Sequence, residues 1–297
     1  MVWGFEPNVG TLVASARLQL PADFSDAADG FTLTACNARL WLFGGVFHSP
    51  SHIWSFNEGA GWQRAGRVPP EHERWCHCTV AWGSALYVLG GSSIDDDLTT
   101  PTGSAVCLDL EAWEWRALPD MPVPVALAAA AVLGTKIYVT GGSGNNDNAV
   151  ATVQCFNLLT ETWSCLSPLT KPREGHAMTV APTSAGRTLV VVEKGSDDPV
   201  EIFDQLQKTW CAARTGRSAV VGKGGCALVT LPRNAGMWTF SITRLGGNNK
   251  LLAARVLWDQ DNCTPATPSI TTSAGQEDCA QHIAASLFPL AADCFQQ

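Results

Sequence analysis

A glycine doublet recurs along the chain at nearly constant spacing, each time after a short apolar run. Complete copies end in Gly44-Gly45, Gly90-Gly91, Gly141-Gly142 and Gly246-Gly247, and a degenerate copy ends at Gly195. The final glycines therefore fall at 45, 91, 142, 195 and 247. A period of about 50 residues indicates a repeat architecture in which each repeat is one small structural unit.

A second signature keeps phase with the first. An apolar residue precedes Asn or Asp, and a tryptophan follows a few positions later. The copies are Phe56-Asn57 with Trp62, Leu108-Asp109 with Trp115, Phe156-Asn157 with Trp163, and Phe203-Asp204 with Trp210. We predict that the Asn or Asp begins the turn into the outermost strand of a unit. The tryptophan would fill the space between adjacent sheets.

Each unit predicts four short strands separated by turns, because no segment of it has helical periodicity. The run before each doublet is continuously apolar, which predicts a strand buried on both faces. The glycines permit positive φ and a close approach of neighbouring backbones. One four-stranded sheet cannot bury its own faces, but a closed ring of such sheets can. We therefore predict an all-β propeller of six four-stranded blades, or five if the C-terminal segment is a tail.

The N-terminus offers a way to close this ring. Residues 3–6 resemble residues 54–57, and Leu12 then stands at the tryptophan position. Residues 1–20 would supply two strands of a blade shared between the two ends, giving a propeller over residues 1–262. Residues 263–297 either complete that blade or form a tail, and residues 276–287 are also compatible with a helix.

Composition narrows the classes of partner and compartment. The net charge is -8 and no cluster of Lys or Arg occurs, so we expect no nucleic-acid partner. The 11 cysteines are an odd number spread along the chain, which favours a reducing compartment. Residues 1–20 lack the pattern of a signal peptide, and the apolar run 123–133 is too short to span a bilayer. We expect a cytoplasmic or nuclear protein with no membrane partner.

The glycine doublet, the tyrosine shortly ahead of it and the spaced tryptophan resemble the kelch-repeat family over roughly residues 36–260. Two linkers strengthen the resemblance, since residues 74–77 and 172–176 both place Arg three residues before His. The resemblance implies a kelch β-propeller that binds another protein, as in the BTB-kelch adaptors of cullin-3 ubiquitin ligases. No BTB or BACK pattern stands before the repeats in this sequence, so we expect either a kelch-only protein, which would reach a cullin-3 complex through a BTB protein, or a shortened product of a longer gene.

In such adaptors, arginines at the start of each blade line a pocket that grips a peptide. The resemblance implies partner contacts at the blade starts, and we expect them at Arg74, His77, Arg173, His176 and Arg214. We also expect contacts at Asn145 and Asn146, because they lie in a polar loop after a glycine doublet and binding residues concentrate on loops held by a rigid scaffold. Arg can form forked bonds to a carboxylate. The alternative is a structural arginine that bonds turn carbonyls. Val125 replaces the arginine at the third blade and Arg214 lies out of phase, so the arginines would not continue around the ring.

Catalytic and metal motifs find little support. Cys76-His77-Cys78 lacks a second Cys/His cluster, and in a strand His77 would point away from the two cysteines. We expect no catalytic residue, no metal and no cofactor. Two alternatives to the adaptor hypothesis stay open: an enzyme on a kelch scaffold, such as a sugar isomerase or specifier-type lyase, and a kelch protein that binds actin or the cytoskeleton.

Overall fold

The computed structural model describes residues 4–6, 11–13, 30–44, 52–57, 59–93, 100–183, 186–192, 200–213, 226–230, 237–245 and 248–256. These residues are almost all in strands or turns. They contain no α-helix, and their two 3-10 helices span Pro70–His72 and Asn145–Asp147. No helical segment within the described ranges has the length and hydropathy needed to cross a membrane. The strands belong to two compact units, β3–β16 in one and β1, β2 and β17–β23 in the other.

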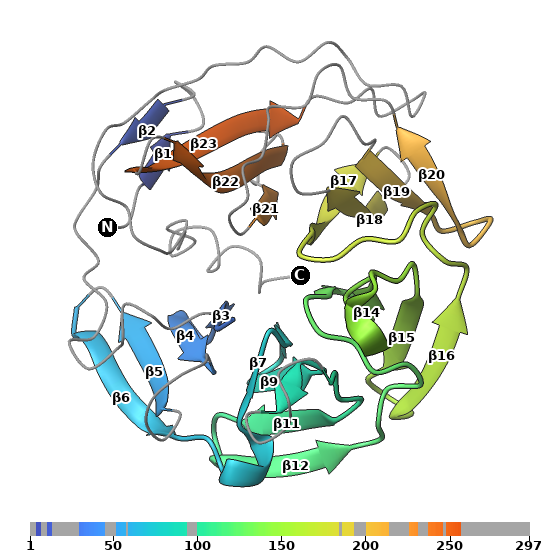
Figure 1. Ribbon diagram of the computed structural model, residues 1–297. Coiled ribbons are helices and arrows are strands. Elements are labelled where there is room, and N and C mark those ends of the chain that lie inside the picture. Colours follow the sequence, from blue (N-terminus) through green and yellow to red (C-terminus); the bar gives the residue numbers. More distant parts are fainter. Residues whose placement is uncertain are drawn as a thin grey trace. The chain divides into compact units, whose positions relative to one another are not determined.

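The unit of β3–β16 contains three antiparallel four-stranded sheets, in each of which the spatial order follows the chain (Figure 1). Adjacent sheets meet through their first strands, since β3 lies beside β8 and β8 beside β13. The sheets are β3 (Thr32–Cys36), β4 (Arg39–Phe43), β5 (His52–Asn57) and β6 (Gly61–Arg67); β8 (Cys78–Trp82), β9 (Ala85–Leu89), β11 (Ala105–Asp109) and β12 (Glu114–Leu118); and β13 (Ala129–Leu133), β14 (Lys136–Thr140), β15 (Val153–Asn157) and β16 (Thr162–Leu166). A short pair, β7 (Arg74–Trp75) and β10 (Ser92–Ser93), adds to the second repeat.

The second unit repeats the pattern. Its four-stranded sheet contains β17 (Ala177–Thr183), β18 (Gly186–Val192), β19 (Val200–Asp204) and β20 (Thr209–Ala213). Beside β17 lies the first strand of a three-stranded sheet, β21 (Cys226–Thr230), β22 (Met237–Leu245) and β23 (Asn248–Val256). The predicted four-strand repeat is thus confirmed in four sheets among the described residues.

The N-terminal strands pair as the sequence comparison predicted. β1 (Gly4–Glu6) is antiparallel to β2 (Thr11–Val13), with Phe5 opposite Leu12. The same register places Phe56 opposite Trp62 in the first four-stranded sheet. Residues 257–297 lie outside the described ranges, so the closing blade and the number of blades stay predictions.

The glycine doublets adopt the backbone that was predicted for them. Gly90 and Gly91 have φ of 63° and 92°, and Gly141 and Gly142 have 56° and 104°. The Gly91 N–H donates to the Val125 carbonyl at 2.9 Å. A Cβ on Gly91 would lie 2.6 Å from the carbonyl oxygen of Trp75. Positive φ and close backbone approach are therefore both confirmed. Gly44 also has positive φ, at 73°, whereas Gly45, Gly246 and Gly247 lie outside the described residues.

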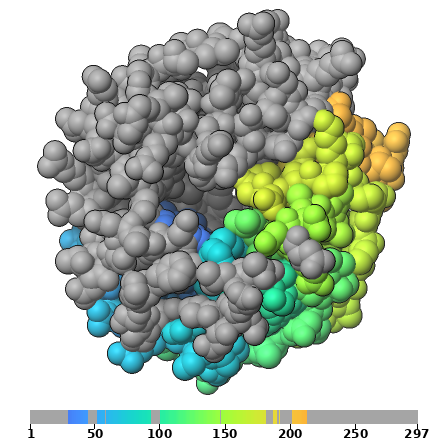
Figure 2. Space-filling model, in the orientation of Figure 1, coloured from blue at the N-terminus to red at the C-terminus, as the bar shows by residue number. Residues whose placement is uncertain are grey.

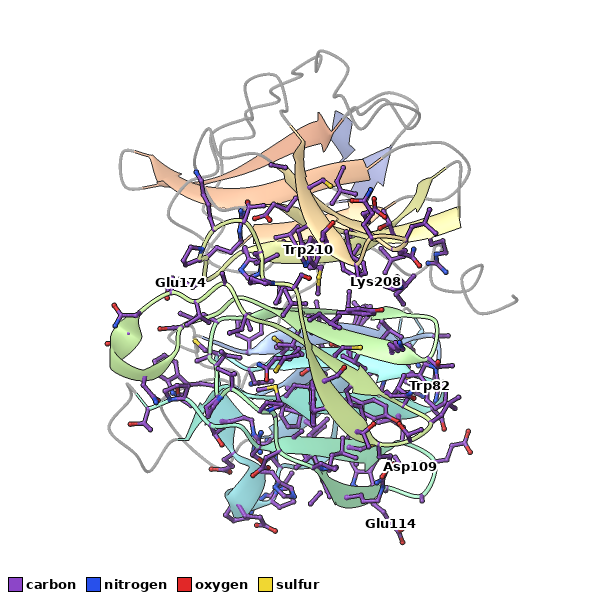
Figure 3. All side chains as sticks on the ribbon, turned by 90° about the vertical axis from the view of Figure 1, so that its right-hand side faces the viewer. Trp82, Asp109, Glu114, Glu174, Lys208 and Trp210 are labelled. Carbon is purple, nitrogen blue, oxygen red and sulfur yellow. The ribbon has the colours of Figure 1, made fainter. Side chains whose placement is uncertain are left out.

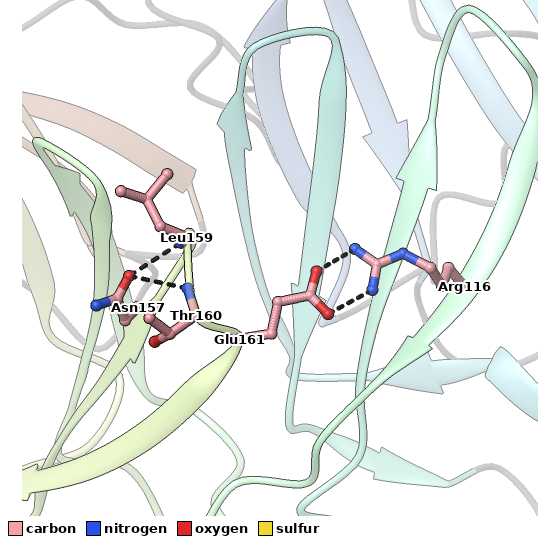
Figure 4. A network of polar contacts seen from close by, with 5 residues as sticks. All are labelled: Arg116, Asn157, Leu159, Thr160 and Glu161. Carbon is pink, nitrogen blue, oxygen red and sulfur yellow. Dashed lines mark hydrogen bonds and ion pairs between the residues drawn. The ribbon is translucent and has the colours of Figure 1, made fainter.

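The Asn or Asp of the second signature begins a turn in all four repeats, as predicted. Its side-chain oxygen accepts a backbone N–H two or three residues later, a local bond that favours turns. The pairs are Asn57 with Ala60 at 2.7 Å, Asp109 with Glu111 at 2.8 Å, Asn157 with Leu159 at 2.9 Å (Figure 4) and Asp204 with Leu206 at 2.8 Å. At the β11–β12 hairpin, Figure 3 labels Asp109 and Glu114, the paired residues that flank this turn.

Large apolar side chains fill the space between neighbouring sheets of the β3–β16 unit. Trp115 lies 5.6 Å from Phe43 of the first sheet, and the Trp163 indole donates to the Pro119 carbonyl at 2.7 Å. Trp62 and Trp210 pack on Phe56 and Phe203 of their own sheets, at 5.3 and 5.1 Å. The buried cluster between the first two sheets includes Cys36, Trp41, Phe43, Ile53, Leu86, Val88, Val106 and Leu108. Burying each such aliphatic or aromatic side chain stabilises the fold by about 1.5–3 kcal/mol.

A second buried cluster joins the second and third sheets. It includes Cys78, Val80, Tyr87, Leu89, Cys107, Ile137, Val139 and Phe156. In the space-filling view these two sheets meet in a continuous surface on the face shown (Figure 2). Each sheet of this unit therefore hides an apolar face against the next one, which is why a repeat cannot be stable alone.

Candidate partner-binding site

Arg74 lies in β7, immediately before the second sheet, and its side chain is only 3% exposed. The guanidinium donates to the His72 carbonyl at 3.1 Å, the Gly90 carbonyl at 3.4 Å, and the Ser104 carbonyl and hydroxyl at 2.9 and 3.1 Å. Burial lowers its pKa to about 10, with the charge of Asp120 acting in the opposite direction. Arg74 is thus a cation that holds turn carbonyls, the structural alternative considered above, and its role as a partner contact stays a prediction.

Arg173 is still more buried, at 1% exposed. Its backbone joins two parts of the third repeat, because its carbonyl accepts the Gly142 N–H at 2.8 Å and its own N–H donates to Val150 at 3.1 Å. His176, which precedes β17, is 5% exposed. Both side chains are buried, and a contact of either one with a partner stays a prediction.

His77 takes part in a buried polar contact between the first two sheets. Its Nε2 lies 2.9 Å from the Thr32 hydroxyl, which in turn lies 2.7 Å from the Thr79 hydroxyl. The ring packs edge-on against Phe43 at 5.1 Å. Burial and then the charge of Arg74 lower the His77 pKa to about 3, and a hydrogen bond from the ring to the Arg74 backbone acts in the opposite direction. His77 is therefore neutral near pH 7 and serves as a hydrogen-bonding group in the core.

The Cys76-His77-Cys78 segment differs from the expected strand. Cys76 has φ of 51° and forms a bend between β7 and β8, so the alternation predicted for residues 76–78 was wrong. The physical reason is that the chain must leave its pairing with β10 before it can pair with β9. The Cys78 thiol donates to the Ala128 carbonyl at 3.1 Å, and burial raises its pKa to about 12. Within the described ranges, no group of three or more His, Cys, Asp or Glu side chains could hold a metal.

The predicted loop residues lie on the surface as far as the structure describes them. Asn145 is exposed and begins the 3-10 helix that also contains Asn146. The turn is closed by a hydrogen bond from the Gly144 N–H to the Asn148 carbonyl at 2.9 Å. Arg214 lies outside the described residues. The site therefore divides into a buried set of arginines and histidines and an exposed polar loop.

One exposed residue was missed by sequence reasoning. Leu127, just ahead of β13, has φ of 52° and remains 39% exposed. Its signal was present in the alignment of repeats, because Gly30 and Gly175 stand at the same distance before β3 and β17. The second repeat has Cys76 at this position, with φ of 51°, so the left-handed turn accepts residues other than glycine.

A family profile described as the KLHDC2/KLHL20/DRC7 Kelch-repeats domain matches residues 30–240. The chain is similar to F-box/kelch-repeat protein At4g39560 of Arabidopsis thaliana, at 37% identity over 103 residues, which is 34% of this chain and 37% of the relative. It is also similar to Kelch-like protein terF of Aspergillus terreus, at 27% identity over 183 residues, which is 55% of this chain and 39% of the relative. Kelch-like protein 30 of Homo sapiens is 36% identical over 112 residues, which is 35% of this chain and 19% of the relative. The chain thus spans less than half the length of these relatives.

Proposed function

The chain belongs to the kelch-repeat family and has its β-propeller fold, and from this premise we propose that it recognises a segment of another protein as a substrate receptor for a ubiquitin ligase. The family supports the broader statement that this is a protein-interaction module. Fold alone does not fix a function, so the finer role must be argued from the residues.

The observation that carries the proposal is the inward orientation of the residues that define the repeat. Arg74 bonds turn carbonyls, and His77 bonds a threonine of the neighbouring sheet. Since these ionisable groups are engaged in the scaffold, the connecting segments are left as the chemically variable part of the surface. Binding residues concentrate on such loops when a rigid scaffold holds them. The exposed turn 145–148 is the described example.

The ligase role is supported by resemblance and by names. Several relatives carry an F-box label beside the kelch repeats, which records a second module joined to a kelch domain. The resemblance to BTB-kelch adaptors, and not the F-box label, supports the further proposal that the chain reaches a cullin-3 complex through a BTB protein. The thiols of Cys36 and Cys78 are buried in the core, which fits a reducing compartment, and we place the protein in the cytoplasm or nucleus.

The test is affinity purification of the tagged chain after mild cross-linking, with partners quantified by mass spectrometry. Asn145→Arg combined with Asn148→Arg alters the exposed turn, and Gln207→Arg in the β19–β20 turn is the matched control. We expect a stoichiometric partner that is lost with the double variant and retained with the control. A chain that captures no protein but turns over a small molecule would overturn the proposal.

The proposed ligase role is tested by two separate measurements, the co-purification of cullin-3 and the abundance of the captured partner. Cullin-3 should co-purify with the chain, and the captured partner should accumulate when the chain is depleted. A partner whose abundance does not change and that is captured without cullin-3 would remove the ligase role and leave the recognition role intact.

A further inference from the structure

Three neighbouring turns of the second and third sheets form a surface that we call the turn edge. They are the β11–β12 turn (residues 109–114), the β13–β14 turn (residues 133–136) and the β15–β16 turn (residues 157–162). The last two are joined by a hydrogen bond from the Leu158 N–H to the Thr135 carbonyl at 3.0 Å. The turn edge contains two exposed large apolar side chains, Trp113 and Leu159.

The turn edge lies away from the blade starts. Figure 3 shows Asp109 and Glu114 at one end of the unit of β3–β16, and Glu174, which leads into β17, at the other. Because β14 runs from the β13–β14 turn toward the exposed turn 145–148, that exposed turn is also at the far end of the sheet. The turn edge is therefore a surface separate from the one proposed above to recognise another protein.

The second sheet supplies the negative charge of the turn edge. Its turn contains Asp109, Glu111 and Glu114. The Asp109 carboxylate accepts the backbone N–H groups of Glu111 and Ala112 at 2.8 and 3.0 Å, so it is used within the turn. Glu111 and Glu114 are exposed, and neither forms an ion pair with another residue that the structure describes. Two carboxylates of this turn are thus available to a cation from outside.

The third sheet supplies positive charge through Lys136, which is exposed and also forms no ion pair within the described ranges. Its neighbours Ile137 and Val139 alternate along β14, and both belong to the buried cluster shared with the second sheet. Because successive side chains of a strand point to opposite faces, Lys136 lies on the face turned away from the second sheet. The acidic and basic groups are therefore at opposite ends of the turn edge.

An internal ion pair separates these two halves. Arg116 of β12 and Glu161 of the β15–β16 turn form a forked pair at 2.6 and 2.8 Å (Figure 4). Their charges cancel, so the sequence of charge along the turn edge is negative, neutral and positive. A partner of one charge sign would be attracted by one half of this surface and repelled by the other.

Each half also offers apolar surface. The Trp113 ring packs on one side over Gly66, where an added Cβ would lie 2.5 Å from the ring, and remains 37% exposed. In the basic half, Leu159 is 69% exposed. Removing such surface from water is favourable and is not directional, so it adds to the attraction between charges.

We propose that the turn edge binds the turn edge of a second copy of this chain. A two-fold axis would place the acidic half of each copy against the basic half of the other. An interface of this kind requires a surface that is complementary to itself, and segregated opposite charges beside exposed apolar groups meet that requirement. The inference goes beyond the proposed recognition function and does not depend on it.

The experiment measures self-association of the whole purified chain by analytical ultracentrifugation over a range of concentrations. One variant reverses the acidic half, Glu111→Lys with Glu114→Lys, and a second reverses the basic half, Lys136→Glu. We expect wild type to form dimers, and each variant alone to self-associate about tenfold or more weakly, because like charges then face each other. An equimolar mixture of the two variants should form dimers again, because opposite charges then meet in both contacts.

Two further variants complete the test. Leu159→Asp should weaken dimerisation without lowering the unfolding temperature, since the side chain is mostly exposed. Glu71→Lys, which reverses an exposed charge of the 3-10 helix before β7, is the matched control and should dimerise as wild type does.

Three results would overturn the inference: a wild type that stays monomeric at every concentration, a mixture that fails to restore dimers, or a control that loses dimerisation as the other variants do. None of them bears on the capture of a different protein by affinity purification. The proposed recognition function is therefore tested independently of this inference.

Discussion

The carboxamide of Gln154 forms both of its hydrogen bonds with the backbone of a single residue, Val123. Its Oε1 accepts the Val123 N–H at 2.8 Å, and its Nε2 donates to the Val123 carbonyl at 2.9 Å. Gln154 lies in β15 and is completely buried. The side chain thus substitutes for a strand and ties the segment between the second and third sheets to the interior of the third.

Replacing Gln154 with leucine should destabilise the fold. The substitution removes both bonds and leaves the half-buried Val123 N–H and carbonyl without their side-chain partner, and each lost bond costs about 0.5–1.5 kcal/mol. We expect a loss of roughly 1–3 kcal/mol in the free energy of unfolding, measured by urea denaturation. Gln207→Leu on an exposed turn is the control, and an equal loss in both variants would contradict this explanation.

The variant Gln154→Glu tests the hydrogen bond that the Gln154 Nε2 donates separately from the bond that its Oε1 accepts. The carboxylate keeps the bond from the Val123 N–H but faces the Val123 carbonyl with a negative charge in place of a donor. We expect this variant to be less stable than wild type at pH 7 and to recover part of the difference as the pH falls and the carboxyl is protonated. Denaturation at a series of pH values measures the recovery, and a difference that stays constant with pH would contradict it.

Substitutions at Gly91 and Gly83 distinguish two reasons for a glycine: a positive φ, and close approach of a neighbouring backbone. Both have positive φ, 92° and 60°, but a Cβ on Gly83 would meet nothing within 4 Å while one on Gly91 would meet the Trp75 carbonyl at 2.6 Å. We expect Gly83→Ala to cost about 1 kcal/mol for the conformation alone. Gly91→Ala should cost at least about 3 kcal/mol, because backbone must also move. Equal losses in unfolding free energy would show that close approach at the doublet is unimportant.

His77 should make the protein sensitive to acid. Its pKa falls from an ordinary 6.5 to about 3 in the fold, so below pH 6.5 the unfolded chain binds a proton that the native chain does not. Neutral His77 therefore makes its whole contribution to the free energy of unfolding above pH 6.5. This contribution is lost as the pH falls toward 3, by up to about 1.4 kcal/mol per pH unit. We expect His77→Gln to show a shallower loss of unfolding free energy between pH 6.5 and 4 than wild type. Parallel curves for the two proteins would contradict this assignment.

Glu161 affects the stability of the fold in two opposite ways, through an ion pair and through backbone strain. It forms a forked ion pair with Arg116 at 2.6 and 2.8 Å (Figure 4), and it also has a positive φ of 53°. The two side chains are 43% and 53% exposed, so the pair contributes only about 0.5 kcal/mol. We expect Glu161→Ala to be less stable than wild type by about that amount, and less so in high salt. The free energy of unfolding of Glu161→Gly, measured by urea denaturation, should be about 1 kcal/mol higher than that of Glu161→Ala, because glycine relieves the strain of the positive φ. A glycine variant no more stable than the alanine variant would contradict this.

Local patterns predicted the strands and turns well. The continuous apolar run 86–89 became the buried strand β9, and Asp109 became the acceptor of a turn, because both outcomes depend on neighbours within a few residues. The bend at Cys76 was not predictable in the same way. It follows from the pairing of β7 with β10, which brings together segments some eighteen residues apart.

The sequence by itself determined the period of the repeat, the four-stranded unit and the turn chemistry, since these are properties of short segments repeated in phase. Only the tertiary structure decided which side chains at the blade starts are exposed to solvent. Arg74 and Val125, which replaces it at the third blade, are 3% and 1% exposed, because turn carbonyls of its own repeat enclose the arginine and the apolar cluster of the second and third sheets encloses the valine. Burial is a property of what packs against a residue, and no pattern within the segment itself contains that information.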